Sequence, residues 1–141
     1  MSSERIKKEM KDAAIMGERA LTSLLYVQVT LYAAKSQKIC SMTGNGSGRA
    51  MLRHTGIHMN AYIRTAGQDL NQFREQLHIT HVPSQLQPKV GKFMMVTAHP
   101  FEEVHGKRMC PEDVTRLEKK VEDMISCTTE ILRGLRELGV Y

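Results

Sequence analysis

The sequence predicts an all-α fold, an antiparallel bundle of three long helices with a short irregular or helical insertion between the second and the third. Three stretches carry apolar or small residues at alternating steps of three and four, the spacing of a helix packed along its length on other helices. Aromatic residues make up only 5% of the chain and ten methionines are present. Such aliphatic, methionine-rich cores suit helix packing, and we expect residues 1–141 to form a single domain.

The C-terminal stretch, 111–138, has the most regular pattern. Pro111 suits the first position of a helix, where its missing N–H group has no partner in any case. Glu112 and Asp113 place negative charge at the positive end of the helix dipole. Gly139 readily adopts the left-handed conformation that ends a helix. We expect the following seam to face the core: Val114, Leu117, Val121, Met124, Thr128, Ile131, Leu135 and Leu138.

The N-terminal stretch predicts a first helix over about 3–42, because the same spacing continues from 6 to 34. Residues 26–32 are rich in β-branched and aromatic side chains and would also suit a strand. The unbroken period favours a helix through them. Gly17 lowers helix propensity by about 1 kcal/mol relative to Ala and marks a candidate bend.

Glycine and proline divide the rest of the chain. The loop 43–48, TGNGSG, separates the first helix from a second one expected over about 49–79. Prolines and glycines recur through the insertion 81–109, so no long helix crosses it. Its one compact apolar run, 90–98, is expected to be a short helix or a strand.

Charge is distributed unevenly along the chain, whose net charge is +5. Residues 35–108 carry ten Lys or Arg and four Asp or Glu, whereas residues 109–141 carry five and seven. A basic middle segment favours an anionic partner, although two oppositely charged segments that pack together would show the same pattern. A solvated outer helix face explains it too. The candidate polyanion-binding residues are Arg49, Arg53, Arg64, Arg74, Lys89, Lys92, Lys107 and Arg108.

No motif for catalysis, a cofactor or a metal ion stands out, and we expect a protein that is not an enzyme. The pairs His54/His58 and His78/His81 have the spacing of metal ligands, but no CxxC or HExxH motif accompanies them. Cys110 precedes a helix start, which favours a reactive thiolate, and His105 lies five residues upstream. No third group completes a Cys–His nucleophilic site. The loop 43–48 lacks the Gly-Lys-Ser/Thr ending of a phosphate loop.

The most apolar run, 20–34, is shorter than the roughly 20 residues that a membrane span needs. Three widely spaced cysteines do not indicate a disulfide framework and fit a reducing compartment. We therefore expect no membrane span and a cytoplasmic or nuclear location.

The leading functional hypothesis is an interaction or assembly module that self-associates as a homodimer and docks a protein partner through helix seams. Its basis is the run 20–34, which has apolar residues on more than one helix face. In the alternative, the insertion 81–109 of the same chain packs on the second apolar face of this helix. Nucleic-acid or polyanion binding through residues 35–108 is the alternative function. The candidate self-association residues are Leu21, Leu25, Val29 and Tyr32.

Overall fold

The computed structural model describes residues 3–42, 47–102 and 111–140, with side chains described at 3–35, 59–102 and 112–140. The elements within these ranges are helices and none is a strand, which confirms the all-α class. The helix expected through 26–32 is confirmed, and of the two alternatives for 90–98 the short helix is confirmed at 90–96 and the strand is wrong. The helices are α1 (Ser3–Met42), α2 (Ser47–Ile79), α3 (Gln87–Val96) and α4 (Pro111–Glu137).

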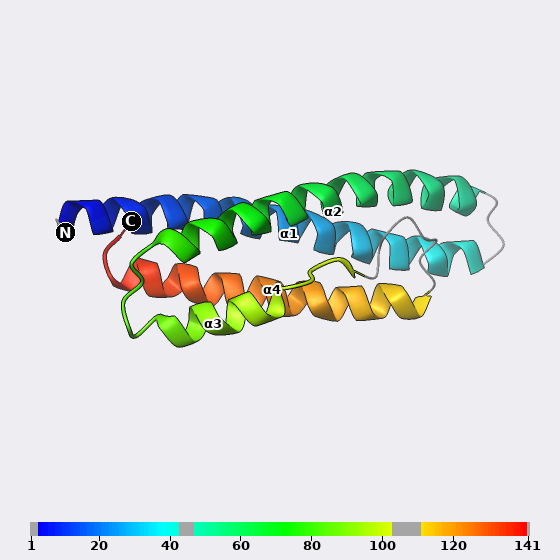
Figure 1. Ribbon diagram of the computed structural model, residues 1–141. Helices are drawn as coiled ribbons and strands as arrows, with labels where there is room; N and C mark the ends of the chain where they lie inside the picture. Colours follow the sequence, from blue (N-terminus) through cyan, green and yellow to red (C-terminus); the bar gives the residue numbers. More distant parts are fainter. Residues whose placement is uncertain (1–2, 43–46, 103–110, 141) are drawn as a thin grey trace.

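The direction of the last long helix differs from the one expected for an antiparallel bundle of three helices, in which the third helix would run parallel to the first. Each helix runs back along the one before it, so α1 and α3 point one way and α2 and α4 the other (Figure 1). The insertion contains a fourth helix, α3, and this adds one reversal of the chain. The last long helix therefore runs parallel to α2, where the sequence had suggested that it would run antiparallel. Ten residues of α3 are enough for about 15 Å of helix.

Helix α1 packs on both α2 and α4 and supplies the centre of the core. Leu24, Val27 and Leu31 are fully buried. The α4 seam is confirmed at Leu117, Val121, Met124, Ile131 and Leu135, each at most 2% exposed. Leu138, expected at the end of that seam, follows the end of α4 and is 37% exposed.

Glycines allow close approach at two levels of the bundle. Helix α1 continues through Gly17 without a break, and a Cβ atom there would lie 2.9 Å from both Leu132 Cδ2 and Phe73 Cζ. The role of Gly17 is therefore to admit neighbours from α4 and α2, where the sequence had suggested a bend. Gly134 of α4 gives the same kind of room to Leu86, the residue before α3.

Helix α3 is held against α2 by one aromatic contact and one charged group. Phe93 is buried, and its ring centroid lies 5.0 Å from that of Phe73. The Arg74 guanidinium donates hydrogen bonds to the Met94 carbonyl at 2.8 Å and to the Thr97 hydroxyl at 2.7 Å. A cation at the C-terminal end of a helix is also favoured by the helix dipole. Arg74 thereby fastens the end of α3 to α2.

A pair of glycine substitutions tests this packing. Gly134→Ala adds a methyl group where Leu86 already lies, so overpacking should outweigh the gain in helix propensity and lower the free energy of unfolding by about 1 to 2 kcal/mol. Gly91→Ala meets no atom within 4 Å and should raise it by up to about 1 kcal/mol. Chemical denaturation measures both. Equal stabilisation by the two substitutions would contradict the close contact between Gly134 and Leu86.

Candidate interaction surface

The apolar side chains Leu21, Leu25, Val29 and Tyr32 form a surface that we call the α1 outer face. Leu21 is partly buried against the core, whereas Leu25, Val29 and Tyr32 are 42%, 66% and 70% exposed. At about 100° per residue, all four fall within one sector of the helix, beside the sector that α4 covers. The middle of the longest helix therefore carries both a buried apolar stripe and an exposed one.

An open groove of about 350 Å³ runs between α1 and α4 along this face. Gln28, Val29 and Tyr32 line it from α1, and Glu118 and Glu122 line it from α4. At one edge the Lys35 ammonium lies 3.4 Å from a carboxylate oxygen of Glu118. The groove thus combines an apolar side with two carboxylates, and its open shape suits a protein surface better than an enclosed small molecule.

The described part of the insertion, 81–102, packs elsewhere. Helix α3 lies against α4, and its buried Phe93 contacts Phe73 of α2, while Val29 and Tyr32 stay largely exposed. The described residues of the insertion therefore do not cover the α1 outer face.

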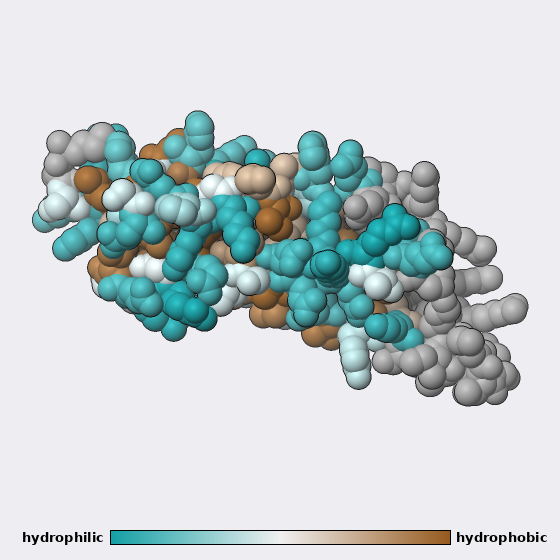
Figure 2. All heavy atoms as spheres, turned by 90° about the horizontal axis from the view of Figure 1, so that it is seen from below, coloured by the Kyte–Doolittle hydropathy of each residue, from teal (hydrophilic) through white to brown (hydrophobic). Residues whose placement is uncertain are grey.

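Viewed from below Figure 1, the surface is mostly hydrophilic, with hydrophobic side chains in separate patches (Figure 2).

The opposite edge of α1 has a different character. The rings of Tyr26 and Tyr62 stack with centroids 5.6 Å apart and planes 11° from parallel. Nearby, the Ser23 hydroxyl donates a hydrogen bond to the Asp69 carboxylate. These contacts join α1 to α2, so this edge already has a neighbour within the chain.

Four of the eight candidate polyanion-binding residues have described side chains. Arg64 and Lys92 are exposed. Arg74 is directed into the protein by its bonds to α3, and Lys89 pairs with Glu130 at 3.5 Å. The other four side chains, Arg49, Arg53, Lys107 and Arg108, lie outside the described residues. The structure thus does not gather the described four into one free cationic surface.

The candidate metal ligands and the candidate nucleophile are placed as follows. Among the described residues, no group of three or more His, Cys, Asp or Glu side chains is arranged to hold a metal ion. His78 is exposed on α2 and His81 pairs with Glu9. Cys127 is buried in the core, and burial raises the pKa of its thiol. The other candidates lie outside the described side chains: His54, His58, Cys110 and the loop 43–46.

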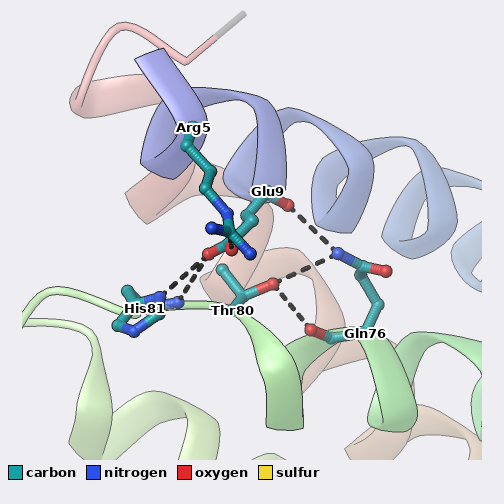
Figure 3. A network of polar contacts seen from close by, with 5 residues as sticks. All are labelled: Arg5, Glu9, Gln76, Thr80 and His81. Atoms are coloured by element: carbon teal, nitrogen blue, oxygen red, sulfur yellow. Dashed lines mark hydrogen bonds and ion pairs between the residues drawn. The ribbon is translucent and has the colours of Figure 1, made fainter. Parts of the chain in front are cut away.

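A polar network that the sequence did not reveal joins the start of α1 to the end of α2 (Figure 3). The Glu9 carboxylate accepts a hydrogen bond from the His81 backbone N–H at 3.3 Å and lies 3.0 Å from His81 Nδ1. Arg5 lies 3.8 Å from its other oxygen. The Gln76 side-chain amide donates hydrogen bonds to the Glu9 backbone carbonyl and to the Thr80 hydroxyl. These residues are 67 to 72 positions apart across the two helices, so no local pattern identifies them.

The chain matches no family model, and neither a curated protein nor a solved structure is similar to it. Within the described ranges, no helix is both long enough and apolar enough to cross a membrane.

The Glu9 contacts predict a pH dependence of stability. Hydrogen bonding to His81, assisted by Arg5, holds the pKa of Glu9 below its ordinary value of 4.5. A lowered pKa means that the ionised form stabilises the fold above pH 4.5 and that this contribution is lost as the pH falls through the lowered value. Wild type should therefore exceed Glu9→Gln in melting temperature at pH 5.5, and the gap should shrink at pH 3.

The matched control is Glu75→Gln, on an exposed part of α2. Thermal unfolding followed by circular dichroism at the two pH values compares the three proteins. A gap between wild type and Glu9→Gln that stayed constant down to pH 3 would show that the Glu9 carboxylate contributes nothing as an ion.

Proposed function

We propose that the protein is a non-enzymatic helical interaction or assembly module that forms a homodimer through the α1 outer face and docks a protein partner through helix seams. The observation that carries the proposal is the exposure of Val29 and Tyr32 in the middle of α1, one or two residues away from the buried Val27 and Leu31. A helix that is apolar on nearly all sides is normally covered on nearly all sides. Closed two-fold dimers are the commonest symmetric assemblies, so a second copy is the first candidate for this cover.

Energetics favour a dimer of modest affinity. Complete burial of a Val or Leu side chain contributes about 1.5 to 3 kcal/mol. Part of each of the Leu25, Val29 and Tyr32 side chains is already buried in the single chain, so a dimer gains less than this from each. Association costs on the order of 4 to 15 kcal/mol in lost translational and rotational freedom. Apolar contact on its own therefore leaves little net affinity. Complementary polar groups around the face have to set the strength and orientation of the dimer.

The polyanion-binding alternative has less support. Among the basic side chains of the middle segment, Arg74 and Lys89 already have partners within the chain. An electrostatic complex with nucleic acid would weaken steeply with salt, whereas an apolar dimer would not. Heparin elution and dimer affinity at two salt concentrations separate the two functions.

The double substitution Val29→Glu with Tyr32→Glu tests the dimer. Both side chains are exposed, so the bundle should fold normally. Four carboxylates would be buried in the dimer, which should weaken it by at least about 100-fold. Size-exclusion chromatography with light scattering should give twice the 16.0 kDa chain mass for wild type and the monomer mass for the variant.

Ile79→Glu with Met95→Glu is the matched control. Those two apolar side chains are 62% and 81% exposed and lie on α2 and at the end of α3. This variant should keep the wild-type mass. A wild-type protein that stays monomeric at high concentration would refute the homodimer, and so would a Val29/Tyr32 variant that still dimerises with wild-type affinity.

A further inference from the structure

A stripe of charged residues on α4 lies beside the α1 outer face. At about 100° per residue, residues 118, 122, 133 and 136 fall within a sector of about 60° on one side of the helix. Its first half is acidic, with Glu118 and Glu122, and its second half is basic, with Arg133 and Arg136. We call these four residues the α4 charged stripe.

The position of the stripe follows from how α1 and α4 are paired. The two helices are antiparallel, with Gly17 opposite Leu132 and Lys35 beside Glu118. Leu25 therefore lies about level with residues 125–126 of α4. The acidic half of the stripe shares a groove with Val29 and Tyr32. The apolar face and the midpoint of the stripe thus fall at nearly the same height along the bundle.

We propose that the occupant of this face is a second copy of the chain, related by a two-fold axis that passes between the two α1 helices near Leu25 and runs perpendicular to them. This proposal rests on the homodimer proposed above and specifies its geometry. In it, α1 lies antiparallel to α1 of the second copy, so Leu25 meets Leu25 and Leu21 meets Val29. The acidic half of each α4 charged stripe faces the basic half of the other.

Charge selects this orientation over its main competitor. If the two copies lay parallel, a two-fold axis along α1 would place the two α4 charged stripes on opposite sides of the dimer, where they make no contact. A parallel axis along α4 would instead place Glu118 and Glu122 opposite the same carboxylates, and the arginines opposite arginines. Like charges placed opposite one another at an interface disfavour that arrangement strongly. The antiparallel arrangement turns the same four residues into two sets of opposite-charge contacts, because the two-fold axis repeats each contact.

The ion pairs already present in one chain do not prevent these contacts. Arg133 lies 2.9 Å from Glu130, with side chains 59% and 41% exposed. Glu118 lies 3.4 Å from Lys35, whose side chain is 57% exposed. Exposed pairs of this kind contribute little to stability and exchange partners readily. Each can remain as part of a wider network when the second copy arrives.

The size of the surface fits a dimer of modest affinity. The stripe from 118 to 136 spans about 27 Å at 1.5 Å per residue, and two packed helices are roughly 20 Å wide. That corresponds to on the order of 500 Å² per copy and 1,000 Å² in total, near the lower limit for a specific interface.

A charge exchange tests the geometry. One variant carries Glu118→Lys and Glu122→Lys, and the other carries Arg133→Glu and Arg136→Glu. Each variant alone brings like charges together and should be monomeric where wild type is dimeric. An equimolar mixture restores opposite charges at both ends of the interface. It should form a heterodimer about 100-fold tighter than either variant binds itself.

Native mass spectrometry identifies the heterodimer, because the two variants differ in mass, and circular dichroism confirms that each is folded. Adding Val29→Glu and Tyr32→Glu to either variant should abolish the heterodimer. If wild type dimerises but the mixture forms no heterodimer, the antiparallel charge pairing is overturned while the homodimer stands. Variants that each dimerise as wild type does would overturn the pairing too. A monomeric wild type would overturn both proposals.

Discussion

The whole arrangement depends on α1 packing against α2 and α4 at the same time. Gly17 makes this close contact feasible, because a side chain there would collide with Leu132 from α4 and Phe73 from α2. Two neighbours on one side bury Leu24, Val27 and Leu31 completely. The same two neighbours leave the remaining side of α1 uncovered, and that side is apolar at Leu25, Val29 and Tyr32. The candidate interaction surface is thus a direct consequence of how the core is assembled.

The position of helix α3 leaves the α1 outer face open. It packs on α4 and α2 through Phe93, Leu86 and the Arg74 hydrogen bonds, on the side of the bundle away from the α1 outer face. The one short helix of the described chain therefore completes the core without covering α1. Within the described residues, no segment of the chain packs on Leu25, Val29 and Tyr32 closely enough to bury them.

Much of the fold could be predicted from local pattern. The period of three and four residues places the ends of the long helices within two residues of those in the structure, and it identified the buried seam of α4. The number of helices, and with it the direction of the last one, could not be predicted in the same way. A ten-residue helix spans fewer than three turns, so α3 has too few apolar positions to show a clear period. Missing it reversed the expected direction of α4 relative to α2.

The candidate site was predictable in part for the same reason. Leu21, Leu25, Val29 and Tyr32 stood out because they lie off the main seam of one helix, and this can be read from residue numbers. The groove partners Glu118 and Glu122 were not identified, because they adjoin α1 only through the pairing of helices 83 or more residues apart. Arg74 looked like a free cation for a similar reason, since its partners on α3 are 20 and 23 residues away.

The claim that the α1 outer face meets its own copy can be measured directly by disulfide cross-linking at Leu25. A chain with its three cysteines replaced by Ser or Ala and carrying Leu25→Cys would be oxidised in dilute solution, beside the same chain carrying Ile79→Cys. A residue near a two-fold axis lies next to its own counterpart, and cysteines bridge only when their Cα atoms come within about 7 Å. The account predicts rapid, nearly complete covalent dimer at position 25 and little at position 79. Slow and equal cross-linking at both positions would contradict it.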